Sequence, residues 1–252
     1  MKMRTAILAA LVLMPAALSA QGAAPHIEIA DRDRAAGKVA SSYQHLEMAI
    51  KADPTSYAAL WRASRDAVDL GEAETDKGRR TQLYRSAEEY ARRAVSANPA
   101  DAEGHFTLAR ALGRTAQSLG SRERVKYAGE VREHALHALK ADPRHAGALH
   151  VMGVWNAEVM RLSGIQRFAA KNLLGGKVFG EASWAEARRY MEAAVAAEPD
   201  RITHHLDLGA VYADVGEKAK AREQFELVAR MPAKELNDAK YKREAAAMLA
   251  KL

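Results

Sequence analysis

Alanine and larger apolar residues recur at helical spacing along most of the chain, and proline interrupts this pattern at regular intervals. The phrase Ala-x-x-Ala, then Asp, Asn or Glu, then Pro occurs four times, ending at Pro54, Pro99, Pro143 and Pro199. Proline ends a helix, because it lacks an amide hydrogen and forces the preceding residue out of helical conformation. The two alanines should share a helical face that a neighbouring helix approaches closely. Spacings of 45, 44 and 56 residues predict a repeat array.

The last repeat shows the pattern most fully. It consists of Leu208-Gly209-x-x-Tyr212, Gly216, Ala221 and Phe225, and closes near Pro232. This is the spacing of the tetratricopeptide repeat, an antiparallel helix pair of about 34 residues. Gly209 is expected to allow close approach of the partner helix, and Gly216 to make the turn. The sequence therefore predicts an all-α, tetratricopeptide-type helical-hairpin solenoid of about four helix pairs over residues 31–252.

Capping helices and one insertion complete the prediction. A lone second helix before Pro54 and a final helix over residues 237–252 should cap the array, since exposed ends of a solenoid need covering. The third spacing is long because of an insertion near residues 163–183. Apolar and basic residues alternate there, so the insertion is expected to be a packed connector or, alternatively, a lid over the groove.

Residues 1–20 resemble a secretory signal peptide. A basic start at Lys2 and Arg4 precedes an apolar stretch and the small residues before Gln21. The stretch is shorter than the roughly 20 residues that span a bilayer, although an uncleaved anchor is the alternative. We expect cleavage near Ala20, an exported chain (periplasmic or extracellular), a flexible segment over residues 21–30, and no integral membrane span in the mature chain.

Composition narrows the chemistry. The chain has no cysteine, which excludes disulfides, thiolate catalysis and cysteine-ligated metals. Its formal charge of +6 is spread along helical faces rather than clustered, so a nucleic-acid partner is not expected. His134 and His137 follow Glu133 on one predicted helix, but spacing fixes no third metal ligand. With no phosphate loop or nucleophile elbow either, we predict a protein that is no enzyme and needs no cofactor or metal.

Several motifs, in order, resemble the regulator of microtubule dynamics family. They are Leu60-Trp61-Arg62-x-x-Arg65, Gly104-His105-Phe106, Gly153-x-Trp155-x-x-x-Val159, Leu173-Leu174, Leu208-Gly209-x-x-Tyr212 and Glu244-Ala245-Ala246-x-x-Leu249. The resemblance covers about residues 30 to 252. It implies an all-helical repeat domain without catalytic activity, with microtubule and membrane-contact-site association and, in a related domain, phospholipid handling. At its start this chain differs, carrying the export signal in place of an organelle-membrane anchor.

First helices of such repeats line a concave groove, and the repeat register assigns side chains to it. These are Trp61, Arg65, Asp69, Glu103, Phe106, Arg110, Arg114, His150, Val154 and Glu158. Trp61 lies four residues before Arg65, and Phe106 four before Arg110, so each aromatic should neighbour an arginine.

An arginine beside an aromatic plane suits a carboxylate or phosphate attached to an apolar group. We therefore expect a protein or extended peptide partner with an anionic group, and a phospholipid or other apolar ligand as the alternative. In a competing interpretation Trp61 and Phe106 belong to the core, and the arginines pair with Asp69 or Glu158.

Overall fold

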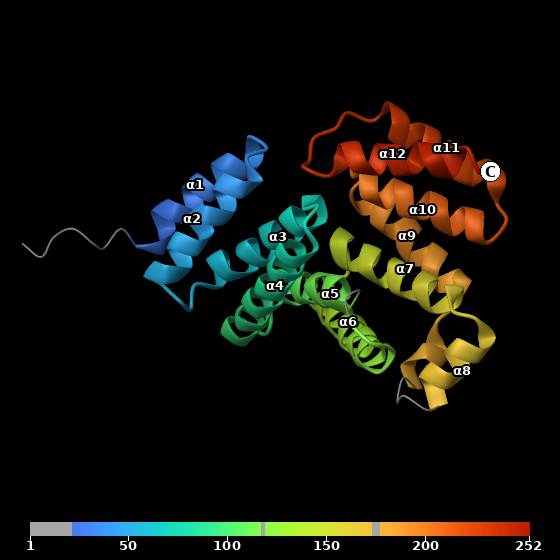
Figure 1. Ribbon diagram of the computed structural model, residues 1–252, viewed down its shortest axis with the longest axis horizontal. Coiled ribbons are helices and arrows are strands. Elements are labelled where there is room, and N and C mark those ends of the chain that lie inside the picture. Colours follow the sequence, from blue (N-terminus) through green and yellow to red (C-terminus); the bar gives the residue numbers. More distant parts are fainter. Residues whose placement is uncertain (1–21, 117–118, 173–176) are drawn as a thin grey trace, which may run out of the picture.

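The computed structural model describes residues 22–116, 119–172 and 177–252, and all regular structure in these ranges is helical (Figure 1). The first half of the chain forms α1 (Ala23–Ala35), α2 (Val39–Ala52), α3 (Tyr57–Ala73), α4 (Lys77–Ala97), α5 (Ala102–Ala116) and α6 (Ser121–Ala141). The second half forms α7 (Ala146–Arg161), α8 (Gly164–Asn172), the 3-10 helix η1 (Lys177–Glu181), α9 (Trp184–Ala197), α10 (Ile202–Asp214), α11 (Lys218–Arg230) and α12 (Asp238–Leu249).

Helices pair into hairpins, and the hairpins stack into a curved array (Figure 1). The pairs are α1 with α2, α3 with α4, α5 with α6, α7 with α9, and α10 with α11, followed by α12. The first helices of the successive pairs from α3 to α10 also touch one another, so they share one side of the array. The predicted tetratricopeptide-type solenoid is confirmed, with five pairs in the described ranges instead of about four.

Each repeated phrase ends a helix as the proline predicts. The residues before the four prolines have left the helical region, with φ between -145° and -133° and ψ between 79° and 99°. The first alanine of each phrase, such as Ala49 or Ala138, is fully buried. The second is exposed in three phrases, as at Ala52 and Ala141, and half-buried at Ala197. The expectation that both alanines pack is wrong, because the second lies in the final turn, where the chain is already turning into solvent.

Two glycines carry the geometry of the last repeat. A Cβ on Gly209 would lie 2.5 Å from Cε1 of Phe225, so α10 and α11 approach as closely as they do only because this position lacks a side chain. Gly216 has φ +81° in the turn between them, a conformation that glycine adopts without strain. Both roles predicted for these glycines are confirmed.

The helical domain begins earlier in the chain than the sequence predicted. Residues 22–30 were expected to be flexible and α2 to stand alone, but α1 begins at Ala23 and pairs with α2. Ala30 is fully buried against Leu46 and Ala49, which explains why α2 does not stay uncovered. Alternating charges around Arg32 and Arg34 obscure the apolar face of α1 in the sequence.

The insertion is partly a packed connector. Phe179 of η1 and Ala170 of α8 are buried, and the Phe179 ring meets Trp155 edge-on at 5.9 Å between centroids. The other side of α8, with Ile165 and Phe168, faces solvent. Four residues of the predicted insertion, Leu173, Leu174, Gly175 and Gly176, lie outside the described residues, as does the predicted signal peptide, residues 1–20.

The array curves so far that the segment around α12 reaches back to α3 (Figure 1). The segment before α12 lies beside the end of α3 (Figure 1), and the Nδ2 of Asn237 donates to the backbone oxygen of Asp69 at 2.9 Å. The Tyr241 hydroxyl donates to Glu72. These contacts join residues 168 and 169 positions apart and close the concave side of the array. Among the described helices, none is both long and apolar enough to cross a membrane.

Candidate ligand-binding cavity

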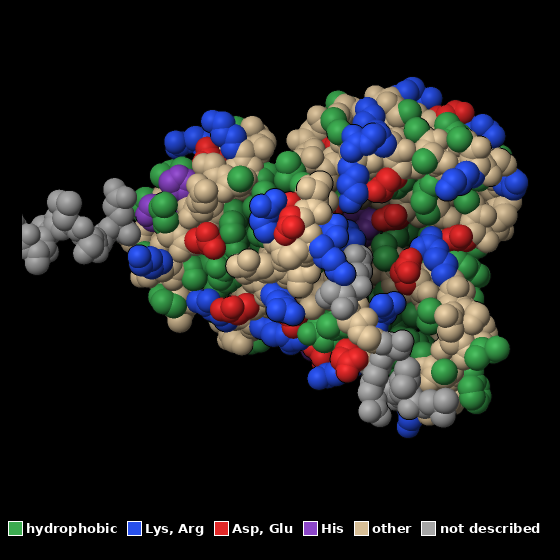
Figure 2. Space-filling model, viewed as in Figure 1, with side chains coloured by type: hydrophobic (Ala, Val, Ile, Leu, Met, Phe, Trp, Pro, Cys, Tyr) green, Lys and Arg blue, Asp and Glu red, His purple; other side chains and the backbone are tan. Residues whose placement is uncertain are grey.

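A cavity of about 1400 Å³ occupies the concave side of the array. In Figure 2 a hollow opens near the middle of the molecule, with cationic and anionic side chains around it. Its walls come from α3, α5, α7 and α10, and the segment around α12 closes it. The volume exceeds the roughly 300–1,000 Å³ of most small-molecule pockets. The cavity therefore has room for a ligand larger than a typical small molecule.

All the side chains assigned to the groove from repeat register line this one cavity. They are Trp61, Arg65, Asp69, Glu103, Phe106, Arg110, Arg114, His150, Val154 and Glu158. The register is visible on α3, where Trp61, Arg65 and Asp69 recur every fourth position, while Leu60 and Ala63 pack into the core. The structure thus brings the predicted residues together, and their binding of a ligand stays a prediction.

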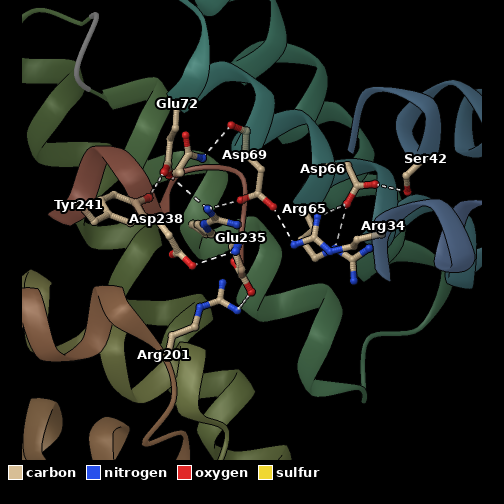
Figure 3. A network of polar contacts seen from close by, with 12 residues as sticks. Arg34, Ser42, Arg65, Asp66, Asp69, Glu72, Arg201, Glu235, Asp238 and Tyr241 are labelled. Atoms are coloured by element: carbon tan, nitrogen blue, oxygen red, sulfur yellow. Dashed lines mark hydrogen bonds and ion pairs between the residues drawn. The ribbon is translucent and has the colours of Figure 1, made fainter. Parts of the chain in front are cut away.

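An ion-pair network fills the end of the cavity near α3 and α12 (Figure 3). Asp69 accepts hydrogen bonds from Arg110 at 2.6 Å and Arg34 at 2.8 Å. Glu72 pairs with Arg114 at 2.6 Å and with Arg110 at 3.2 Å. Burial alone would raise the pKa of Asp69, but Arg110 and Arg34 outweigh it and lower the pKa to about 2.

This network changes the role of two predicted arginines. Arg110 and Arg114 are held by carboxylates of the protein itself, so the competing interpretation, in which Arg110 pairs with Asp69, is correct. Glu158 pairs with Arg161, which was not among the predicted groove arginines. Trp61 and Phe106 are only half-buried, so neither is fully covered by the next repeat.

Arg65 differs from the other arginines. Its Nε donates to Asp66 at 2.9 Å, and its guanidinium lies 5.2 Å from the centre of the Trp61 ring. Its Nη2 is buried without a hydrogen-bond partner among the described residues. Burial lowers the pKa of Arg65, and Asp66 offsets this only in part. An anion next to Nη2 would therefore supply a missing hydrogen bond and a missing charge partner.

The charges at this end are closely matched. Four guanidinium groups pair with three carboxylates around α3, and Arg201 and Glu235 extend the network (Figure 3). Arg34, from α1, bridges Asp66 at 2.7 Å and Asp69 at 2.8 Å, and Ser42 donates to Asp66. The α1–α2 hairpin therefore fixes the carboxylates against which Arg65 is placed.

Histidines form a second polar group on the cavity wall. The Nδ1 atoms of His150 and His204 lie 2.9 Å apart, so one ring donates to the other. The Nε2 of His150 lies 3.2 Å from Asp207, and the buried Nε2 of His204 lies 3.4 Å from Glu198. Burial lowers the pKa of His204 to about 4, which keeps that ring neutral near pH 7. Within the described ranges no group of three His, Asp or Glu side chains could hold a metal ion.

The opposite part of the cavity is apolar. Val151, Trp155 and Phe179 line it and belong to one hydrophobic cluster that α5, α6, α7, α8 and η1 share. The Trp155 Nε1 donates to the backbone oxygen of Ala128 at 2.8 Å, so this indole is satisfied within the wall. The cavity is therefore amphipathic, with charged residues near α3 and an apolar patch around Trp155 and Phe179.

Sequence reasoning missed several residues of the site. Arg34 and Asp66 escaped because α1 was not expected to fold, and Asn237 and Tyr241 escaped because they reach α3 from the other end of the chain. The local sequence around them carries no signal for that contact. For Arg34, the alternating charges over residues 31–34 could have suggested a bridging role.

Comparison with known proteins agrees with the fold. A family described as "Regulator of microtubule dynamics protein 1-3" matches residues 26–252. The chain is 27% identical to regulator of microtubule dynamics protein 1 of Bos taurus over 192 residues, covering 75% of this chain and 60% of that protein. For the Caenorhabditis elegans protein of the same name the identity is 26%, covering 76% and 84%. The chain thus spans about 60% of the length of the mammalian relatives.

A solved structure shows the same architecture. The crystal structure of TTC0263, a thermophilic tetratricopeptide repeat protein of Thermus thermophilus, superposes with a TM-score of 0.61 at 21% identity, covering 90% of this chain and all of that one. At this identity the likeness establishes the fold and leaves the ligand open.

Proposed function

The chain belongs to the regulator of microtubule dynamics protein 1-3 family, and from that premise and its cavity we propose that it is a non-catalytic binding protein. It holds an extended segment of a partner protein in the concave cavity, with an anionic group of the partner against Arg65 and Trp61. Apolar side chains of the partner lie along the wall that contains Val151 and Trp155. Repeat solenoids use their concave surfaces for such contacts.

The buried Nη2 of Arg65 is the observation that carries this proposal. A guanidinium nitrogen removed from water without a partner costs free energy, which a carboxylate from a ligand would recover. The indole of Trp61 beside it offers a flat apolar surface to the group that bears the carboxylate. A chain terminus or an acidic side chain of a peptide combines these two features.

A peptide library tests the proposal directly. Peptides selected on the wild-type protein are titrated with free and with amidated carboxyl groups, and the affinities are compared by calorimetry. We expect Arg65→Gln to weaken binding at least about tenfold, because a charge-assisted hydrogen bond is lost. Glutamine can still donate to Asp66, which protects the fold.

Arg62 provides a matched control for that variant. It lies 4.4 Å from the centre of the same Trp61 ring and pairs with Asp31, but it does not line the cavity. Arg62→Gln should therefore bind the selected peptides as wild type does. Equal affinity of Arg65→Gln and wild type, or failure to select any peptide, would contradict the proposal.

The apolar wall favours a second candidate, an amphipathic lipid. Its headgroup would take the place of the peptide carboxylate at Arg65, and its chains would lie against the cluster around Trp155 and Phe179. Organic extraction of the purified protein distinguishes the two, since only a lipid ligand passes into the organic phase.

Export and the microtubule property are separate proposals. We propose that residues 1–20 direct export and are removed near Ala20. Amino-terminal sequencing of protein recovered outside the cytoplasm should then begin near Gln21.

The relatives are named as regulators of microtubule dynamics. Co-sedimentation with polymerised tubulin tests whether that property extends to this chain.

A further inference from the structure

Helix α8 carries the two most exposed large apolar side chains recorded for the described residues. Ile165 is 83% exposed and Phe168 is 63% exposed. They are three positions apart, so they project from the same side of the helix. Neither contributes to the hydrophobic cluster beneath α8. In Figure 2 hydrophobic side chains gather at the corner of the molecule that α8 forms in Figure 1.

The inner side of α8 is fixed to the body of the protein. Ala170 is 4% exposed and packs in the same cluster as Phe179 and Trp155. At the start of the helix, Ser163 and Gln166 exchange hydrogen bonds between backbone amides and side-chain oxygens. Because the helix is already formed, its outer face can dock on a surface without further ordering of the backbone.

The unpaired charges recorded along this stretch are positive. From Val159 to Gly180 the sequence contains no Asp or Glu, but it contains Arg161, Arg167, Lys171 and Lys177. Arg161 is neutralised by Glu158 and Asp214. Lys171 and Lys177 are exposed, and neither has an acidic partner in the described part of the chain. Lys171 and Lys177 are thus unpaired cations beside the apolar tip, whereas the carboxylates that flank this stretch, Glu158 and Glu181, are paired with Arg161 and Arg132.

We propose that α8 docks the protein on an anionic lipid bilayer. Ile165 and Phe168 enter the apolar layer, and Lys171 and Lys177 stay among the anionic headgroups. A bilayer needs no complementary pocket for two protruding side chains, and its negative surface attracts a segment that has only positive charges. A protein pocket would have to match both their shape and their charge. This surface lies outside the cavity and does not depend on what the cavity binds.

Because the chain has no cysteine, one introduced cysteine reports a single position. Phe168→Cys in the full chain is labelled with a polarity-sensitive fluorophore and mixed with vesicles of equimolar phosphatidylcholine and phosphatidylglycerol. Met48→Cys, on α2 and 49% exposed, is the matched control. We expect the emission at position 168 to shift to shorter wavelength, and the emission at position 48 to stay unchanged. Circular dichroism of both labelled chains checks that they are folded.

Two further variants of the chain labelled at position 168 separate the apolar contribution to vesicle binding from the electrostatic one. Ile165→Ser should raise the lipid concentration for a half-maximal shift about tenfold, since one large apolar side chain no longer leaves water. Replacing Lys171 and Lys177 by Glu should raise it at least as much, and about 1 M salt should weaken wild-type binding because it screens the headgroup charge.

Three results would overturn the proposal. One is an unchanged spectrum at position 168 with anionic vesicles, and another is an equal shift at position 48. The third is a shift at 168 that grows with protein concentration in the absence of vesicles, which would assign this face to a second copy of the chain. Loss of peptide binding in Arg65→Gln concerns the cavity alone and leaves vesicle docking as it was.

Discussion

Replacing Asp69 by asparagine removes the negative charge that two half-buried arginines share, while it preserves the shape of the side chain. The Asp69 side chain is 7% exposed and lies 2.6 Å from Arg110 and 2.8 Å from Arg34. Its backbone oxygen also receives the hydrogen bond from Asn237 that closes the array. Asp69→Asn should therefore destabilise the cavity wall at the point where α1, α3, α5 and the segment before α12 meet.

The magnitude follows from two independent arguments. The ion pairs lower the pKa of Asp69 from 3.8 to about 2, and at about 1.4 kcal/mol per pH unit this corresponds to roughly 2–3 kcal/mol. Removing one partner of a buried ion pair costs about 3–5 kcal/mol when the other charge is left uncompensated. Arg110 keeps Glu72 and Arg34 keeps Asp66, so this figure is an upper bound here. We expect a loss of about 3 kcal/mol in the free energy of unfolding.

Urea unfolding followed by far-ultraviolet circular dichroism measures this loss. Glu186→Gln is the control, since Glu186 pairs with Arg189 at 2.7 Å but both side chains are well exposed. Such surface pairs contribute at most about 1 kcal/mol. A change below about 0.5 kcal/mol in Asp69→Asn, which is the size of an ordinary surface substitution, would refute the reasoning.

The ion pairs of Asp69 also predict how the stability of the protein depends on pH in the acid range. The folded pKa of Asp69 lies below its ordinary value, so the unfolded chain binds the proton first. The contribution to stability is fully present above about pH 4 and is lost as the pH falls towards 2. In Asp69→Asn this part of the acid dependence should disappear.

Two further predictions concern the C-terminal half. The pKa of His204 is lowered to about 4, chiefly by burial and further by His150 and Arg201, against Glu198. Stability should therefore decline by about 3 kcal/mol as the pH falls from about 6.5 to 4, and unfolding of His204→Gln at both pH values should show a smaller decline. Gly209→Ala should lose about 1–3 kcal/mol, because the new Cβ would collide with Phe225. In the urea unfolding assay, Gly129→Ala, whose Cβ would meet nothing within 4 Å, should keep or gain stability. Equal losses in the two alanine variants would contradict this account of packing.

The sequence predicted the features that depend on local pattern. Pro54 and its counterparts end helices whatever the rest of the chain does, and Gly209 lies opposite Phe225 because both belong to one hairpin. The groove assignment followed in turn, since the register of a repeat decides which side of α3 carries Trp61 and Arg65.

The features that sequence reasoning missed depend on contacts between distant segments. Neither Asn237 nor Tyr241 has a local reason to touch α3, and the contact exists only because the angles between successive hairpins add up to a closed curve. The ion pairs of Arg110 and Arg114 with Asp69 and Glu72 join α5 to α3, and Tyr241 also donates to Glu72. The ion pairs therefore left Arg65 as the arginine with an open donor.

Native mass spectrometry of the gently purified protein, with wild type and Arg65→Gln measured side by side, tests the binding function most directly. We predict that wild type carries a bound polypeptide and that Arg65→Gln has lost it, while Arg62→Gln retains it. A bound mass that extracts into organic solvent as a lipid, or a polypeptide retained equally by all three proteins, would contradict the account.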